Sequence, residues 1–304
     1  MSIPGVTVDL GELVRLAGAV RSLRLGPGRR AAAVRAGGHL SVHKGRGLEF
    51  DEVRQYQAGD EVRSIDWRIT ARRGKPHTRL YREERERPIF VLADLNPGMF
   101  FGTRRQLKSV QVARLAAMAA WAALHHGDRV GGVVIGAEAF AVLPARARRH
   151  GVMALIQALV RLQPTAPGAS RPGRLDEGLA KLRSLTRPGS LILLLSDFGE
   201  MESDGERLLG GLARHSDLVA GFVHDPLEAQ PPAAGRFGFA NLGRRLLLDT
   251  GQDEVQQRWA AAFRQRQQDL HALGQKSGFP VLDIATDMEP RQVLQQGLAR
   301  LGRT

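Results

Sequence analysis

The stretch that decides the fold is Ile89-Phe90-Val91-Leu92-Ala93-Asp94-Leu95-Asn96-Pro97-Gly98. It begins as a continuous apolar run of strand length and ends in acidic, amide and turn-forming residues. An Ala-rich segment of helical composition follows at 106–126. A strand that is apolar at successive positions is typical of a parallel sheet covered on both faces by helices. The stretch therefore predicts the first strand of an α/β domain.

The same alternation of apolar strands and helices continues to the end of the chain. Gly136-Ala137 is too short to connect parallel strands, so the strand after it should pair antiparallel at the sheet's edge. The predicted fold class is α/β, with a doubly wound, mostly parallel sheet. Strands are expected at 89–95, 129–135, 138–143, 190–196, 218–224, 244–249 and 279–284, and helices at 106–126, 151–162, 175–185, 205–215, 253–274 and 290–301.

The region before Pro88 has a different pattern. Apolar residues at helical spacing predict an amphipathic helix over residues 9–24, and the rest is rich in turn residues, with extended pieces at 64–69 and 77–81. We therefore expect two domains: an N-terminal helix plus a turn-rich β module over 1–87, and the α/β domain over 88–304.

Within that module, charged residues, aromatic residues and glycines recur between positions 45 and 72 in an order too regular for a linker. The residues of this series are Gly47, Glu49, Phe50, Arg54, Tyr56, Gly59, Asp60, Arg63, Asp66, Trp67 and Arg72. The series resembles the domain-of-unknown-function 58 family, whose members carry it ahead of a von Willebrand factor A-like domain. We expect these residues to be structural or to contact a partner, with Asp66 pairing with one of the module's arginines (Arg54, Arg63 or Arg72) and Trp67 filling a gap between the domains.

A doubly wound sheet binds ligands beyond the carboxyl ends of its strands, where the strand order reverses. Asp94 and Asp197 both end strands there, so we expect them at one rim. The resemblance implies a divalent-ion site at this crevice, built from Asp, hydroxyl groups and a Thr. Here Asn96, Gly98 and Arg174 stand at the positions of the two Ser and the Thr.

These replacements predict a degenerate site. Gly98 offers no side-chain ligand, and the guanidinium of Arg174 would repel a cation while pairing with Asp94 or Asp197. We therefore expect no tightly bound metal and no cofactor, with weak Mg²⁺ binding through Asp94, Asn96 and Asp197 as the most that the crevice would support. The simpler interpretation is that both Asp residues cap the helices that follow them.

Composition restricts the class of protein. The formal net charge is +13, with 18 Lys and Arg against 11 Asp and Glu in residues 1–87, and 26 against 20 in the remainder. The excess is spread along the chain, and aromatic residues are only 5%, which disfavours a surface that stacks bases. Nucleic-acid binding is nevertheless retained as the alternative function. No apolar run approaches the roughly 20 residues of a membrane helix, so we expect no membrane span and a cytoplasmic protein.

Signatures of catalysis are weak. Asp249-Thr250-Gly251 matches the loop of aspartic proteases, but a helix is predicted directly after it, for which Thr250 or Asp253 would serve as the N-cap. Phosphate-binding, nucleophile-elbow and zinc-helix motifs do not occur. An aspartic-type hydrolase is therefore the third choice, and no catalytic residues are assigned.

The resemblance implies a partner, because members of this family are commonly encoded beside MoxR-type AAA+ ATPases. The predicted function is a non-enzymatic adaptor that binds such an ATPase through its crevice (Asp94, Asn96, Gly98, Arg174 and Asp197) and assists client remodelling or complex assembly.

Overall fold

The computed structural model describes residues 3–23, 48–57, 62, 65–83, 87–169, 171–199, 201–241 and 244–301. The chain divides into two compact units, one made of Met1–Val34 with Arg87–Thr304 and the other of Arg35–Glu86. The N-terminal helix therefore lies in the larger unit. This division differs from the predicted 1–87 and 88–304.

The larger unit is built on a six-stranded sheet in the order β10-β7-β6-β3-β4-β5. Counted from β3, this is the 3-2-1-4-5-6 order of doubly wound folds. All pairs are parallel except β4 with β5, which are antiparallel at one edge. The predicted fold class and antiparallel edge strand are confirmed. The strands are β3 (Pro88–Asp94), β4 (Arg129–Ile135), β5 (Phe140–Arg146), β6 (Leu191–Ser196), β7 (Asp217–His224) and β10 (Val281–Ala285).

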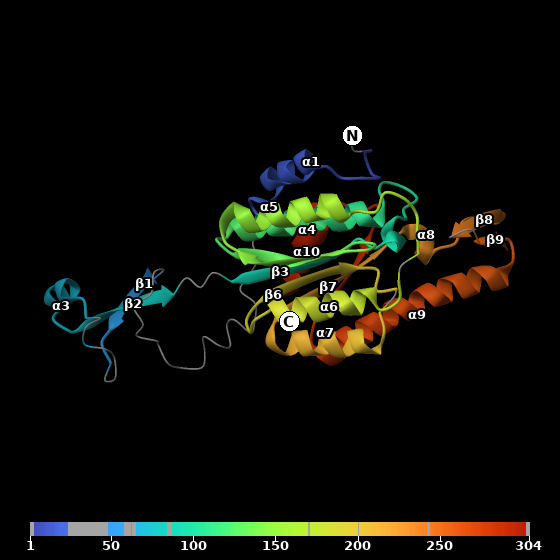
Figure 1. Ribbon diagram of the computed structural model, residues 1–304. Coiled ribbons are helices and arrows are strands. Elements are labelled where there is room, and N and C mark those ends of the chain that lie inside the picture. The colour runs from blue at the N-terminus through green and yellow to red at the C-terminus, as the bar shows by residue number, and fades with distance from the viewer. Residues whose placement is uncertain are drawn as a thin grey trace. The chain divides into compact units, whose positions relative to one another are not determined.

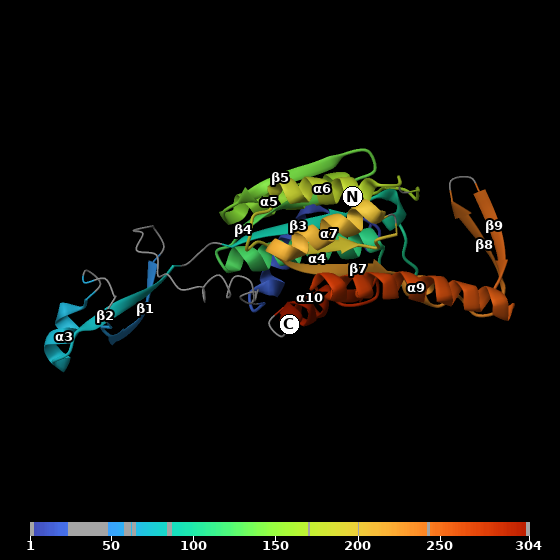
Figure 2. The same cartoon turned by 90° about the horizontal axis from the view of Figure 1, so that it is seen from below.

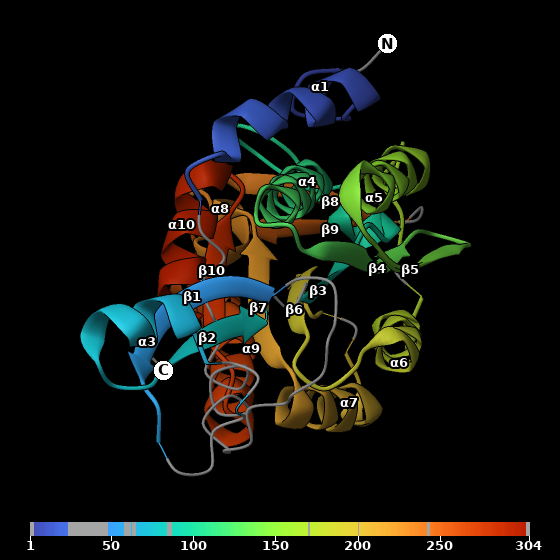
Figure 3. The same cartoon turned by 90° about the vertical axis from the view of Figure 1, so that its left-hand side faces the viewer.

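Helices cover both faces of this sheet (Figures 1 and 3). Along β3, Ile89, Val91 and Ala93 pack into one hydrophobic cluster, and Phe90 and Leu92 into the other. Alternate residues of the strand thus reach opposite faces, so the whole strand must be apolar. The first cluster contains α4 (Lys108–His125), α5 (Arg148–Leu162), α10 (Pro290–Leu301) and the N-terminal α1 (Leu10–Arg15) with η1 (Leu16–Val20), and the second contains α6 (Arg174–Leu185), α7 (Ser203–His215) and α9 (Asp253–Ser277).

The N-terminal helix is fixed to the first of these layers. Asp9 caps α1 by accepting a hydrogen bond from the Glu12 N–H, and Leu13 is fully buried. The indole N–H of Trp121 in α4 donates to the Leu13 carbonyl at 2.9 Å. Burial of this apolar stripe explains why α1 belongs with the sheet.

A short helix and a strand of the larger unit were not predicted from the sequence. A short helix, α8 (Pro226–Ala229), follows β7, and a strand, β8 (Arg236–Asn241), pairs antiparallel with β9 (Arg244–Asp249). The resulting hairpin stands at the amino-terminal end of α9 (Figure 2). The N-cap residue of α9 is Gln252, whose side chain makes no capping hydrogen bond. The predicted capping of this helix by Thr250 or Asp253 is therefore wrong. Thr250 instead donates to the carbonyls of the turn before β8.

The smaller unit pairs β1 (Leu48–Gln55) with β2 (His77–Glu83) as an antiparallel hairpin. The extended piece predicted at 77–81 is confirmed. The one predicted at 64–69 is wrong, because residues from Trp67 onward form helix α3 (Trp67–Arg73). Asp66 begins that helix by accepting hydrogen bonds from the backbone of Arg68 and Ile69 at 3.0 and 3.1 Å.

Other motif residues of this unit are placed as follows. The Trp67 side chain is 66% exposed, Arg72 is exposed, and Tyr56 is half-buried. Packing of Trp67 between the units stays a prediction. Glu49, Phe50 and Arg54 lie on β1, and Gly47, Gly59, Asp60 and Arg63 lie outside the described residues.

Candidate functional site

The strand order reverses between β3 and β6, and the residues after these two strands meet there. Asp94 is 1% exposed. One of its carboxylate oxygens accepts a hydrogen bond from the Ser196 hydroxyl at 2.7 Å, and the other accepts from the Asn96 backbone and side-chain amides at 3.1 and 2.8 Å. The expected meeting of these two chain segments at one rim is therefore observed.

The carboxylates of Asp94 and Asp197 differ in their electrostatic surroundings. Burial, reinforced by the nearby charge of Asp197, raises the pKa of Asp94 to about 6. Burial also disfavours the charge of Asp197, but the ammonium of Lys108 outweighs it and holds the Asp197 pKa below its ordinary value. The rim thus keeps Asp197 ionised while the proton on Asp94 is released near neutral pH.

Lys108 was not identified from the sequence, and it occupies the centre of the rim. Its side chain is 3% exposed, and its Nζ atom donates to Asp197 at 2.7 Å and to Glu228 at 3.1 Å. Burial lowers the pKa of Lys108, but the charges of the two carboxylates outweigh burial and raise it. A sequence signal existed: Lys108 is the one charged residue in the first turn of a helix that is rich in Ala and Leu.

These residues do not fit the divalent ion that the resemblance implies. The ammonium of Lys108 already supplies the positive charge between Asp197 and Glu228. Asn96 uses its side-chain oxygen to accept from the Gly98 N–H at 2.8 Å, and Gly98 has no side-chain ligand. Within the described part of the chain, no group of three His, Cys, Asp or Glu residues is placed to hold a metal.

Arg174 does not join the crevice. Its guanidinium lies 3.8 Å from the centre of the Phe140 ring and donates to the Gly136 carbonyl at 3.2 and 3.3 Å. It also forms an ion pair with Glu177 at 3.4 Å. The predicted pairing with Asp94 or Asp197 is wrong, because a ring face and a free carbonyl lie closer to the start of α6.

The interpretation of Asp94 and Asp197 as helix caps is also wrong. Asp197 accepts from the Gly199 N–H at 3.1 Å, whereas α7 begins after Glu202 without a side-chain cap. Between Asp197 and Gly199, Phe198 has a φ of 52°, a left-handed conformation that bulky residues rarely adopt. Such strain persists only where surrounding contacts hold it, and it is common at functional sites.

A third strand end contributes another buried acid. Asp225 follows β7, is fully buried, and accepts hydrogen bonds from the hydroxyls of Thr103 and Thr286 and from the Leu227 N–H. These hydrogen bonds outweigh burial and lower its pKa. Asp225 also caps α8, and its own N–H donates to Glu228 at 2.7 Å. This acid therefore fixes the loop that carries Glu228 toward Lys108.

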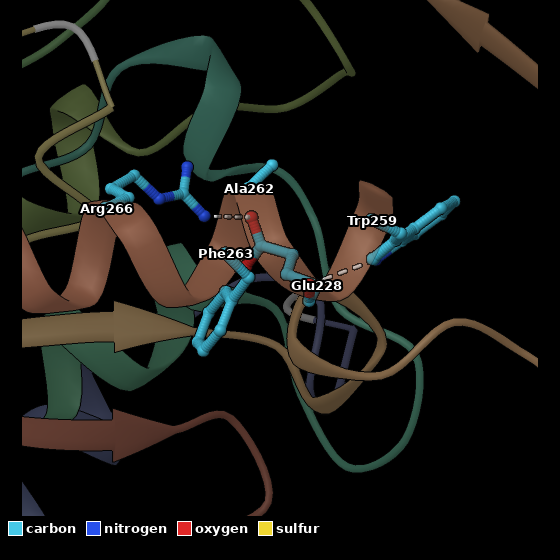
Figure 4. A pocket seen from close by; sticks show the side chains of 5 residues that line it. All are labelled: Glu228, Trp259, Ala262, Phe263 and Arg266. Atoms are coloured by element: carbon cyan, nitrogen blue, oxygen red, sulfur yellow. Dashed lines mark hydrogen bonds and ion pairs between the residues drawn. The ribbon is translucent and has the colours of Figure 1, made fainter. Parts of the chain in front are cut away.

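A pocket of about 330 Å³ opens beside Glu228 and is lined by residues of α8 and α9 (Figure 4). Phe263 is buried, and Trp259 is half-buried, with its indole N–H donating to the carbonyls of Leu227 and Glu228 at 3.0 Å. Arg266 lies over the rings of Phe222 and Phe263 and reaches Glu228 at 3.8 Å. The pocket combines an aromatic wall with a guanidinium next to the rim.

Asp249, by contrast, lies in a local turn. Its carboxylate accepts from the Gly251 N–H at 3.0 Å and lies 3.7 Å from Arg236 of the paired strand.

Comparison with known proteins gives the family. The model of a family described as "Protein of unknown function DUF58" matches residues 52–269. The chain belongs to the DUF58 family. Among the described residues of this DUF58 protein, every helix is too short or too polar to span a bilayer.

Its relatives in sequence include two uncharacterized proteins, Rv1480 of Mycobacterium tuberculosis and Mb1516 of Mycobacterium bovis. Each is 29% identical over 280 residues, which is 90% of this chain and 86% of the relative.

Similar solved structures include the conserved hypothetical protein BatB from Bacteroides thetaiotaomicron, with 12% identity and a TM-score of 0.45 over 72% of this chain and 100% of that one. A von Willebrand factor type A structure from Catenulispora acidiphila has 13% identity and a TM-score of 0.37 over 74% of this chain and 43% of that one.

Proposed function

We propose that this DUF58 protein is a non-enzymatic adaptor that binds a MoxR-type AAA+ ATPase and assists client remodelling or complex assembly. The observation that carries the proposal is the pocket of Trp259, Phe263 and Arg266 beside the closed network at the rim. Crevices at this position of a doubly wound sheet are where such folds bind their ligands. An ATPase partner would meet the protein in the cytoplasm, where ATP is supplied.

The closed network supports binding that needs no metal. Asp197 and Glu228 share one buried ammonium, and Arg266 lies 3.8 Å from Glu228, so two cations compensate the two carboxylates before any partner arrives. Weak Mg²⁺ binding would have to displace Lys108 from both carboxylates. The rim therefore acts as a rigid support for the neighbouring pocket.

Within the pocket, Trp259 and Arg266 are the proposed anchors. Residues of these two types carry a large share of the energy at protein interfaces when they lie in a hollow that the partner closes. The guanidinium of Arg266 makes no hydrogen bond within the described chain, and its contacts are aromatic faces and a 3.8 Å ion pair. Its Nε atom is buried, but the side chain as a whole is 35% exposed, so the terminal nitrogens are the donors that remain for a partner.

The test is capture of the purified ATPase on immobilised protein. Trp259→Ala combined with Arg266→Ala should weaken capture by at least about tenfold, since anchors of this kind contribute about 2 kcal/mol or more. Arg258→Ala is the matched control, because Arg258 lies on the same helix, is 80% exposed and pairs only with Glu254 among the described residues. Unchanged capture by the double variant would remove this pocket from the proposed function.

A further inference from the structure

A second hollow, of about 370 Å³, lies at the opposite end of the sheet. It is lined by the loop that leads into β6 and by the last residues of α7 before β7. Four cationic or titratable side chains surround it, namely Arg183, Arg187, Arg214 and His215. The remaining lining residues are uncharged, so the hollow collects charge of one sign.

These arginines lack the acidic partners that other arginines of this protein have. Arg105 pairs with Glu289, Arg171 with Glu177 and Arg258 with Glu254. Around the hollow, in contrast, no described carboxylate lies within ion-pair distance of Arg183, Arg187 or Arg214. The neighbouring acid Asp217 is engaged by Arg87. Uncompensated charge of one sign around a hollow attracts counter-charged ligands.

Capping of the helix carboxyl termini does not account for the arginines around the hollow. The carbonyls of Leu182 and Leu212, at the ends of α6 and α7, accept hydrogen bonds from the backbone of Thr186 and Ser216. Arg214 donates to a helix carbonyl, that of Gly210, at 3.4 Å. Arg183 and Arg187 therefore present their guanidinium groups to solvent at the hollow.

The lining also indicates what kind of anion fits. It contains no Phe, Tyr or Trp, and His215 is its one aromatic ring, so it lacks the row of aromatic side chains on which successive nucleobases stack. It does contain the exposed apolar side chain of Pro188, which suits an aliphatic group of a peptide. Guanidinium groups pair with carboxylates through two parallel hydrogen bonds.

We propose that this hollow binds an acidic segment of a protein partner, whose carboxylates pair with Arg183, Arg187 and Arg214. The site is separate from the rim of the crevice, because the parallel strands β6 and β7 begin at the hollow and end at the rim. A six-residue strand places the two ends roughly 20 Å apart. An adaptor with two such ends can hold two partners at once.

The probe is a fluorescein-labelled ten-residue peptide of alternating Glu and Leu, titrated with the full chain and followed by fluorescence anisotropy. The hollow variant combines Arg183→Ala, Arg187→Ala and Arg214→Ala. The control variant combines Arg105→Ala, Arg171→Ala and Arg258→Ala, which removes the same charge at exposed positions elsewhere. Circular dichroism verifies that both variants are folded.

The expected result is binding by the wild type that weakens about tenfold in the hollow variant and less than about twofold in the control, since each exposed charge pair contributes a few-fold. Binding should also weaken as salt rises. Equal weakening in both variants would show that diffuse net charge attracts the peptide, and would overturn the proposal. So would absence of wild-type binding, or tighter binding of a single-stranded oligonucleotide or inorganic phosphate at the same arginines.

Discussion

At the scale of single residues, Lys108 has the largest predicted effect. Lys108→Met keeps the aliphatic stem but leaves the carboxylates of Asp197 and Glu228 without their shared cation. Breaking a buried ion pair from one side costs about 3–5 kcal/mol, so the free energy of unfolding should fall by that amount in urea denaturation. Arg105→Met is the control, because its exposed pair with Glu289 contributes about 1 kcal/mol at most. Equal losses in the two variants would contradict the stabilising role of Lys108.

The Lys108→Met variant also tests whether Lys108 takes the place of a divalent ion at the rim. Without the ammonium, the carboxylates of Asp197 and Glu228, which share Lys108 in the wild type, are left with oxygens of the kind that Mg²⁺ prefers. Added MgCl₂ should raise the melting temperature of Lys108→Met and leave that of the wild type unchanged, as ligand binding to a folded state requires. A stoichiometric micromolar magnesium site in the wild type would refute the assignment of Lys108 as the cation of this rim.

Asp94 gives the rim a pH dependence. Its pKa is about 6 in the folded protein against 3.8 for the free side chain. Between these values the folded state binds more protons than the unfolded state, so this group lowers the stability as pH rises through the window. The full shift corresponds to about 3 kcal/mol. Relative to Asp94→Asn, the wild type should therefore lose up to about 3 kcal/mol of unfolding free energy between about pH 4 and pH 7, measured by urea denaturation. A pH-independent difference would contradict the raised pKa.

At the scale of elements, α1 is an integral part of the sheet domain. Leu13 is fully buried against the α4 layer, whereas Leu10 on the same helix is 41% exposed. Leu13→Ala should lower the unfolding free energy by about 2–5 kcal/mol, and Leu10→Ala by less than about 1 kcal/mol. Urea denaturation of the full chain, followed by tryptophan fluorescence, measures both. Similar effects of the two substitutions would argue against burial of α1 on the sheet.

The sequence predicted the sheet because its central strands, such as β3 and β6, are continuous apolar runs, which is a local property. It missed β8 and α8, since Arg236–Asn241 alternates small and bulky residues and Pro226–Ala229 is a single turn. Asp94 and Asp197 could be predicted at one rim from strand order alone. The presence of Lys108 at the rim and the absence of Arg174 from it could not be predicted. Both depend on which side chain reaches which group after the helices pack on the sheet.

At the scale of the whole molecule, the larger unit has two chemically different ends. The carboxyl end of the sheet holds acids compensated by Lys108 and Arg266, and the amino end holds arginines without described counter-charges. This separation could not be read from the net charge of +13. Arg183 and Arg187 come before β6 and Arg214 comes before β7, so they gather only when these two strands start side by side.

The two ends should therefore bind independently. Saturation of the arginine hollow with the Glu-Leu peptide should leave capture of the ATPase by the Trp259 and Arg266 pocket unchanged within about twofold, because sites without shared contacts are additive. The measurement is ATPase capture on immobilised protein with and without peptide, using the Arg183, Arg187 and Arg214 triple variant to show that any effect arises at the hollow. Competition that disappears in the triple variant would mean that both ligands use the amino end. In that event the pocket beside Glu228 would lose its role as the ATPase contact, because a partner seated there would not meet the peptide.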